Sequence, residues 1–222
     1  MKMAPTIVDQ IAERLSARIV SGELRAGTRL RQEEIATEFA SSHVPVREAF
    51  RRLEADGLVV SLPRRGVRVA QHGHEQHFET LEMRAVLEGL AFLHAVAAYT
   101  PEDLGAVIEA DAACGRAGTA EDWEEANRRF HALLIAPCPL PELLHAVRRL
   151  QMTSALSARA LGGKQAGTFP RVDRDHKAIL SALQSGDAEL CATLLTRHIR
   201  RGHLSSGVGR TAGSGAVWTG NR

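Results

Sequence analysis

The feature that most restricts the fold is one pair of short strand-like runs, which follows three helical segments and does not recur later in the chain. The stretch LVVSLPRRGVRVA at 58–70 places two β-type runs on either side of Pro63-Arg64-Arg65-Gly66, a sequence typical of a hairpin turn. From about Phe78 onward no strand pattern occurs. The sequence therefore predicts a mainly α-helical protein with one β-hairpin.

Three helices are predicted before the hairpin. The first opens with a capping pair, Thr6 and Asp9, and its apolar residues recur at helical spacing: Ile7, Ile11, Leu15 and Ile19. After a turn-rich connector at 21–30, the second covers about 31–39. The third is capped by Ser42 and ends at Gly57. Helix, helix, turn, helix and hairpin is the order of a winged helix-turn-helix, which we assign to residues 1–71.

The remainder of the chain is predicted to be a bundle of helices. The polar segment 72–77 is interpreted as a linker, and residues 78–204 as one all-α domain. Helical periodicity and breaks at Gly and Pro predict six helices, at about 77–99, 101–117, 120–136, 140–160, 170–185 and 187–204. Residues 205–222 are rich in Gly and Ser and are expected to be a disordered tail.

Composition excludes several classes. The three cysteines, Cys114, Cys138 and Cys191, are widely spaced, which argues against a disulfide framework and favours a reducing cytoplasm. No apolar run approaches the length of a membrane span, so no membrane partner is expected. Residues 1–72 carry 12 Lys/Arg against 9 Asp/Glu, while 73–205 carry 14 against 17. This mild asymmetry suits an anionic partner for the N-terminal part alone.

The third helix carries the features of a DNA-recognition helix. Arg47 and Arg51 are four residues apart and share a face, whereas Val46 and Phe50 lie on another face and point inward. An arginine face can enter the major groove, where arginine reads guanine. The expected DNA-binding set combines this helix with the preceding helix and the hairpin: Arg31, Ser42, His43, Arg47, Arg51, Arg52, Arg64, Arg65, Gly66 and Arg68. The alternative is a solvated face, with Glu48 and Glu54 as ion-pair partners.

At this point the sequence resembles a known family. Residues 41–70 are similar to the signature of GntR regulators, and the likeness extends over 6–70. The second part resembles the FCD effector domain of the FadR subfamily, in its shorter VanR-like branch. The segments that carry this likeness are Glu82-Met83-Arg84 with Glu88, Asn127 through Leu134, His176 through Asp187, and His198. Two departures are evident: His43 stands where the family usually has Arg, and Asn127 where it most often has Asp.

Three histidines are candidates for a metal site. His131, His176 and His198 each lie on the apolar face of a different predicted helix, and bundle interiors are where facing side chains build metal sites. Taken one at a time, each is better explained as a hydrogen-bonded core residue. The resemblance implies that the three are ligands of a divalent ion, zinc or nickel, with Asn127 as the fourth ligand. A neutral amide in place of a carboxylate predicts weaker metal binding.

Arg84 is the candidate for effector binding. The resemblance implies that it faces the pocket and pairs with a carboxylate. An ion pair with Glu88, four residues on, is an equal alternative.

Together these features predict a non-enzymatic regulator. The expected partners are a near-palindromic double-stranded operator, a second copy of the chain and a small organic-acid effector at the metal. Effector binding would alter the affinity for the operator. By analogy with the family, the protein is expected to be a repressor. One alternative keeps DNA binding but makes the histidines structural, with no effector. A remote alternative is a metallohydrolase, against which the sequence offers no HExxH motif and no evident general base.

Overall fold

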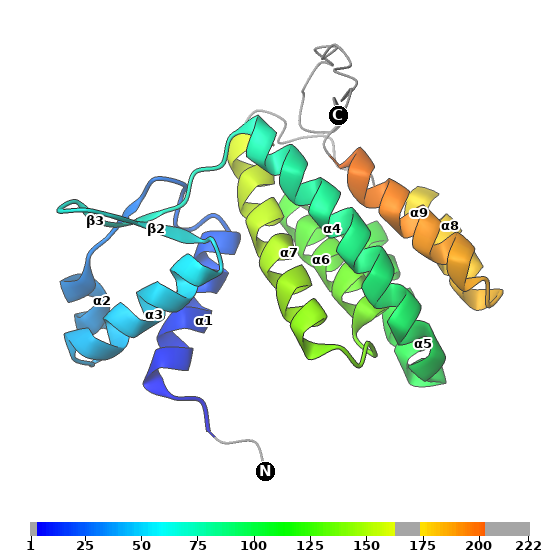
Figure 1. Cartoon of the computed structure of the whole chain (residues 1–222), viewed down its shortest axis with the longest axis horizontal. Helices are drawn as coiled ribbons and strands as arrows, with labels where there is room; N and C mark the ends of the chain where they lie inside the picture. Colours follow the sequence, from blue (N-terminus) through cyan, green and yellow to red (C-terminus); the bar gives the residue numbers. More distant parts are fainter. Residues whose placement is uncertain (1–3, 163–173, 203–222) are drawn as a thin grey trace, which may run out of the picture.

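The computed structural model describes residues 4–162 and 174–202, and its N-terminal part has the predicted order of elements (Figure 1). The elements of this part are α1 (Ile7–Val20), β1 (Arg29–Leu30), α2 (Gln32–Glu38), α3 (His43–Ala55), β2 (Val59–Leu62) and β3 (Gly66–Val69). Three helices pack beside a small antiparallel sheet. The winged helix-turn-helix architecture is confirmed.

The start of α1 is fixed by local hydrogen bonds. The Oγ1 of Thr6 accepts from the backbone N–H of Asp9 at 3.2 Å, and the Asp9 carboxylate accepts from the Thr6 N–H at 2.8 Å. These bonds from Thr6, together with Arg52, lower the pKa of Asp9 to about 2. The predicted capping pair is therefore confirmed. At α3, Ser42 occupies the N-cap position, but its side chain makes no capping hydrogen bond, so that part of the expectation was wrong.

The sheet has one more strand than the sequence predicted. Strand β1 pairs with β3, giving the order β1-β3-β2, with Arg29 opposite Arg68 and Leu30 opposite Val67. The segment 21–30 was expected to be a turn-rich connector, with no strand. Two residues are too few to show the alternation that identifies a strand. Strand β1 forms because Gly27, at φ +80°, turns the chain so that Leu30 is buried against the hairpin.

The rest of the described chain is helical. It contains six α-helices and one 3₁₀ turn: α4 (His74–Ala95), η1 (Val96–Ala98), α5 (Pro101–Arg116), α6 (Ala120–Ile135), α7 (Pro141–Gly162), α8 (Arg174–Gln184) and α9 (Ala188–Arg201). Their number agrees with the prediction for the all-α domain. None of the helices in the part described is long and apolar enough to cross a membrane. The expected disordered tail at 205–222 lies outside the described residues.

The segment between the two helical parts is shorter than predicted. Helix α4 begins at His74, so only the first residues of the expected linker at 72–77 lie outside it. His77, which lies in the segment interpreted as a polar linker, is buried, with 4% of its surface exposed. Residues 71–77 are polar, so they showed no helical pattern, although the first turn of α4 begins among them and one of its histidines faces inward.

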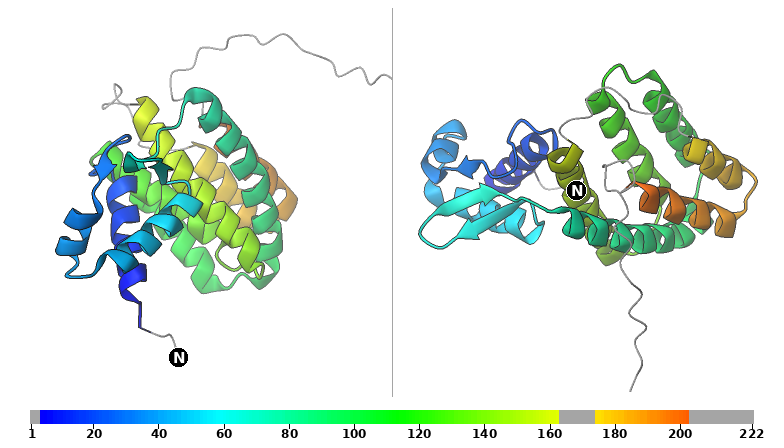
Figure 2. Two further views of the ribbon diagram at one scale, coloured as in Figure 1. Left: turned by 60° about the vertical axis from the view of Figure 1, so that its left-hand side comes forward. Right: turned by 90° about the horizontal axis from the view of Figure 1, so that it is seen from above.

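Helix α7 is shared by two hydrophobic cores. Val147 packs in the core of the helical bundle, whereas Leu156 belongs to the core of the N-terminal domain, where Met152 and Ala155 also pack. Figures 1 and 2 show α7 on the side of the bundle nearest α1. The helix therefore connects the two domains through packing, in addition to the chain connection at 71–73.

Candidate nucleic-acid interface and metal centre

A cleft of about 660 Å³ lies between the sheet and the start of α3. Five residues of the predicted DNA-binding set line it: Arg31, His43, Arg47, Arg51 and Gly66. The side chain of Gln32 donates to the backbone carbonyl of His43 at 2.7 Å, which ties the start of α2 to the start of α3. The cleft is open and rich in guanidinium groups, as an interface for phosphates and base edges requires.

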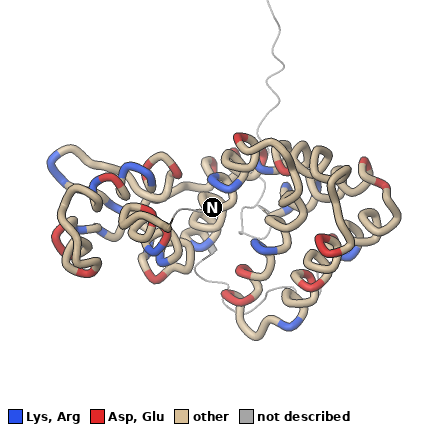
Figure 3. The backbone as a smooth tube through the Cα atoms, turned by 90° about the horizontal axis from the view of Figure 1, so that it is seen from below, with Lys and Arg blue, Asp and Glu red and all other residues tan. Residues whose placement is uncertain are grey.

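The remaining predicted residues lie elsewhere in the same domain. Arg64 and Arg65 are at the tip of the hairpin, which is basic at the left edge of Figure 3, and Arg64 has a left-handed φ of 61°. Arg68 donates to the carbonyl of Gly27 at 3.0 Å, inside the domain. Arg52 forms an ion pair with Asp9 of α1. Arg52 and Arg68 thus make intramolecular contacts away from the cleft. Arg31 and Arg51 also form ion pairs, with Glu34 and Glu48, but they stay exposed and line the cleft.

Sequence reasoning missed Arg29. This residue lines the cleft from β1, and its guanidinium lies close to Gly66, 3.7 Å from the position of an added Cβ. Because β1 was not predicted, no sequence pattern placed Arg29 beside the hairpin and α3.

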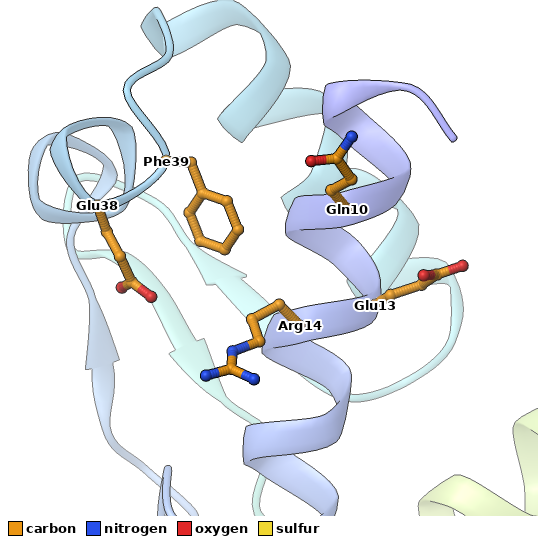
Figure 4. A pocket seen from close by; sticks show the side chains of 5 residues that line it. All are labelled: Gln10, Glu13, Arg14, Glu38 and Phe39. Atoms are coloured by element: carbon orange, nitrogen blue, oxygen red, sulfur yellow. The ribbon is translucent and has the colours of Figure 1, made fainter. Parts of the chain in front are cut away.

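A second surface cavity of about 480 Å³ lies between α1 and α2 (Figure 4). Phe39 and Arg14 face it together with two acidic side chains, Glu13 and Glu38. Its mixed charge does not suit an anionic polymer, and the first cleft remains the candidate for DNA.

The helical domain brings the three predicted histidines together. His131 of α6, His176 of α8 and His198 of α9 each offer a ring nitrogen, and these atoms lie within 4.8 Å of one another. His131 and His176 are buried, and the side chain of His198 is only 13% exposed. The rings of His131 and His198 are stacked at a centroid distance of 5.2 Å. Three helices that are distant in sequence therefore converge on one point.

Each histidine has a carboxylate beside its Nδ1 atom. Glu88 lies 3.0 Å from His131, Asp111 lies 3.2 Å from His176, and Asp175 lies 3.6 Å from His198. An ionised carboxylate only accepts hydrogen bonds, so the contacts of His131 and His176 favour the tautomer that carries the proton on Nδ1 and leaves a lone pair on Nε2. The separation of 3.6 Å between His198 and Asp175 is an ion-pair distance and does not fix the tautomer of that ring. Metal-binding histidines in proteins are commonly oriented in this way.

The ionisation of this cluster follows from its burial. Burial lowers the pKa of His131 to about 4, against the opposing effect of Glu88. Burial alone would raise the pKa of Glu88, but Arg84 and His131 outweigh it, and that pKa falls to about 2. Near neutral pH the cluster therefore pairs a neutral imidazole with an ionised carboxylate.

Asn127 lies one turn before His131 on α6. Its Oδ1 atom is buried and accepts no hydrogen bond from the residues that the structure describes. A buried carbonyl oxygen without a donor is costly unless another group satisfies it. Three converging imidazole nitrogens suit a divalent ion, and an unsatisfied amide oxygen one helical turn from His131 is a candidate for a further ligand.

Each of the two parts of the chain matches a known protein-family model. Residues 7–69 match the model described as bacterial regulatory proteins of the gntR family, and residues 79–201 match the FCD domain. This chain belongs to the GntR family. As a family member it is a transcriptional regulator with an N-terminal DNA-binding domain and an FCD domain.

Relatives within the GntR family cover most of the chain. A probable D-xylose utilization operon transcriptional repressor of Paenarthrobacter nicotinovorans is 30% identical over 87% of this chain and 86% of its own length. A gluconate operon transcriptional repressor of Bacillus licheniformis is 25% identical over 82% of this chain and 77% of its own length. The solved structure of E. coli McbR/YncC superposes with a TM-score of 0.78 at 24% identity, covering 91% of this chain and 97% of that one, which shows the shared fold.

The position of Arg84 in this GntR-family protein supports the ion-pair alternative. Its Nε donates to Glu88 at 2.7 Å, and its Nη1 donates to the Oγ of Ser154 at 2.8 Å. The side chain is 13% exposed, so the pair lies inside the domain. Effector binding by Arg84 stays a prediction.

The carboxylates of the histidine cluster were not identified as site residues from the sequence. Asp175 precedes His176 directly, but nothing in that adjacency predicts contact with His198. Asp111 lies on α5, which carries none of the three histidines, 65 positions before His176. Only the fold brings these residues together.

Proposed function

We propose that this GntR-family regulator is a repressor whose affinity for its operator is set by a small organic acid bound at a metal site in the FCD domain. The observation that carries the proposal is the convergence of His131, His176 and His198, each with a carboxylate beside Nδ1. A buried structural histidine satisfies each of its two ring nitrogens with a partner of its own, whereas three imidazoles that converge on one point suit a shared cation.

The cleft beside α3 supports DNA recognition by one domain. Arg47 and Arg51 are exposed on α3 and line the cleft, while Val46 and Phe50, about 100° away around the helix axis, anchor the helix in the core. We place the start of α3 in the major groove and the hairpin at the adjacent backbone or minor groove. The operator would be double-stranded and near-palindromic, read by two copies of the chain.

One face of α4 supports a homodimer. Four apolar side chains recur on this face and are 36–54% exposed, while the opposite face of the helix is buried in the bundle: Met83, Val86, Leu90 and Leu93. The helix lies at the outer surface of the domain (Figure 2). A continuous apolar stripe on a surface helix is typical of an association surface. A second copy would bury the same stripe by two-fold symmetry.

The metal site would be formed by the three histidines and Asn127. A bound divalent ion would supply open coordination positions for the carboxylate of an effector. Because the four ligands are neutral, negative charge reaches the ion only through the carboxylates behind the histidines, and an anionic effector could bind the ion directly. Two relatives are named as repressors of a D-xylose utilization operon and of a gluconate operon. Gluconate is itself a hydroxy acid, which is the class of effector proposed for this protein.

A thermal-shift titration tests the metal site first. Chelator-treated protein is titrated with zinc, nickel and manganese, and a ligand that binds only the folded state stabilises it by about 2.7 kcal/mol at a hundredfold excess over its Kd. We expect a rise in Tm with at least one ion. The rise should be lost in His176→Ala and retained in His145→Ala, which removes an exposed histidine of α7.

The effector is tested on the metal-loaded protein. DNA fragments selected by the protein from a random pool serve as the operator, and a panel of small hydroxy acids and sugar acids is added. Release of DNA by one acid in the wild type, with no release in His176→Ala, is the expected result. A protein that binds DNA and metal but responds to no acid would favour the regulator with structural histidines and no effector.

A further inference from the structure

Helix α7 contacts the turn that ends the recognition helix. The Oγ1 of Thr153 donates to the carbonyl of Asp56 at 3.4 Å, and Arg149 donates to the carbonyl of Ala55 at 3.5 Å. A Cβ atom on Gly57 would lie 3.3 Å from the Oγ1 of Thr153. The C-terminal end of α3 is therefore packed against the middle of α7, with little free space between them.

On its other side, α7 is joined to the histidine cluster through one buried carboxylate. Glu88 is fully buried, with one oxygen 3.0 Å from Nδ1 of His131 and the other accepting from Gln151 of α7 at 3.1 Å. Arg84, which is also bonded to Glu88, donates to Ser154 of α7 at 2.8 Å. Gln151 and Ser154 thus face the cluster, while Thr153 and Arg149 face α3.

We propose that Glu88 is a positioning residue that orients His131 and, through its hydrogen bond to Gln151, links the state of the metal site to the C-terminal end of the recognition helix. The inference rests on the proposed metal site and adds a route by which that site acts on the DNA-binding domain. The route uses residues of α4 and α7 that lie outside the predicted ligand set.

The physical basis is the sharing of one carboxylate among three donors, because His131 binds one oxygen while Gln151 and Arg84 bind the other. With a cation at Nε2, the Nδ1–H of His131 is a stronger donor, and the ionised Glu88 is drawn toward it. The bond from Gln151 to the other oxygen then changes in length or strength. Helix α7 is packed in both cores and has little free space around it. A displacement of Gln151 therefore shifts α7 slightly, and that shift reaches the end of α3.

The test compares three proteins with zinc as the probe: wild type, Gln151→Met and Arg148→Ala. Methionine keeps the length and helix propensity of Gln151 but removes the donor to Glu88. Arg148 is an exposed neighbour on α7, so its replacement is the matched control. Zinc affinity is measured by calorimetry, and hydrogen–deuterium exchange is followed at amides 49–58 with and without zinc.

We expect zinc to slow exchange at 49–58 in the wild type and in Arg148→Ala. In Gln151→Met the zinc Kd should stay within about threefold of the wild type, while the zinc-dependent change in exchange falls by between twofold and thirtyfold, the range that corresponds to a coupling loss of about 0.5–2 kcal/mol. A variant that merely damaged the fold would also lose zinc affinity or Tm.

Two results would overturn the inference. If Gln151→Met kept the full zinc response, or if zinc bound the wild type without changing exchange at 49–58, the link would be rejected while the metal site remained. If the wild type bound no zinc, the proposed metal site would be rejected and the link with it. The calorimetric and exchange measurements separate these cases.

Discussion

The arginines of α3 illustrate how position decides the role of identical side chains. Arg47 and Arg51 lie four residues apart on the exposed side of the helix, and both line the cleft. Arg52 is one residue further along, which turns it by about 100° around the helix axis toward α1. There it pairs with Asp9, the residue that also caps α1.

This difference gives a first prediction. Arg47→Ala should weaken binding to the selected operator by about 1–3 kcal/mol and reduce discrimination at one base pair, as expected for a side chain that reads a base. Arg52→Ala should change operator affinity by less than twofold and mainly lower the stability of the N-terminal domain. Fluorescence anisotropy and thermal unfolding of both variants check this. Equal losses of DNA affinity would show that Arg52 also contacts DNA.

A second prediction concerns the carboxylates around the histidines. Asp111→Asn leaves an amide that can present its N–H to Nδ1 of His176, so the ring loses its fixed orientation. Loss of such a partner typically costs 10- to 100-fold in metal affinity, and we expect that range for zinc. Glu109→Gln, at an exposed position on the same helix, is the control. Calorimetric zinc titrations of the two variants should differ; similar Kd values would exclude an orienting role for Asp111.

A third prediction follows from the pKa values of His131 and Glu88. The pKa of His131 is about 4 in the folded protein, below its ordinary value of 6.5, so the unfolded chain takes up a proton first as the pH falls. The free energy of unfolding of metal-free protein should therefore decrease between pH 6.5 and 4. Glu88, with a folded pKa of about 2 against 4.5, extends the loss below pH 4.5.

Urea denaturation of chelator-treated protein across this range measures the effect. The His131 imidazole can be followed separately by NMR, where it should remain neutral at pH 5.5. Protonation of that ring near pH 6.5 in the folded protein would contradict the prediction.

Among the elements, α4 combines two apolar faces. One face packs in the bundle and contains Glu88, and the other presents the exposed stripe from Met83 to Leu93. If the stripe is the dimer interface, Val86→Glu should convert a dimer into a monomer with little change in the fold of each chain. Analytical ultracentrifugation measures the mass. Ile108→Glu, at a similarly exposed apolar position on α5, should leave the dimer intact. A wild type that sediments as a monomer would exclude this interface.

Elements with strong local signals were predictable from the sequence. The capping pair and the apolar repeat located α1, and the Pro-Arg-Arg-Gly turn located the hairpin between β2 and β3. Strand β1 was missed because its two residues owe their conformation to pairing with β3 rather than to their own pattern. The start of α4 was placed too late because its first turn is composed of polar residues.

The candidate site was predictable only in part, because some of its contacts depend on tertiary packing and not on a local sequence pattern. The histidines stand on apolar faces, which marks them as inward-facing, and the family likeness grouped them. Asp111 and Gln151 are linked to the site by packing between helices that are distant in sequence, and no spacing rule connects them to a histidine. Such partners become visible only when the bundle is assembled.

At the scale of the whole molecule, α7 makes the two domains interdependent. Leu156 is 3% exposed and lies in the core of the N-terminal domain, although it belongs to a helix of the FCD domain. Leu156→Ala should lower the free energy of unfolding by about 2–5 kcal/mol, as for other buried leucines. Because the helix is shared, calorimetry should show one unfolding transition for the wild type. Two well-separated transitions would mean that the domains unfold independently.

The same shared helix limits how freely this protein can exchange parts with its relatives. A gene segment that encodes residues 1–71 would carry the DNA-contacting surface but leave behind Met152, Ala155 and Leu156, which complete the core beneath it. Recombination at the boundary between the domains would then join a foreign helix to a surface shaped for this one. New operator specificities should arise in such a lineage by point substitution along the exposed face of α3 more readily than by replacement of the whole domain.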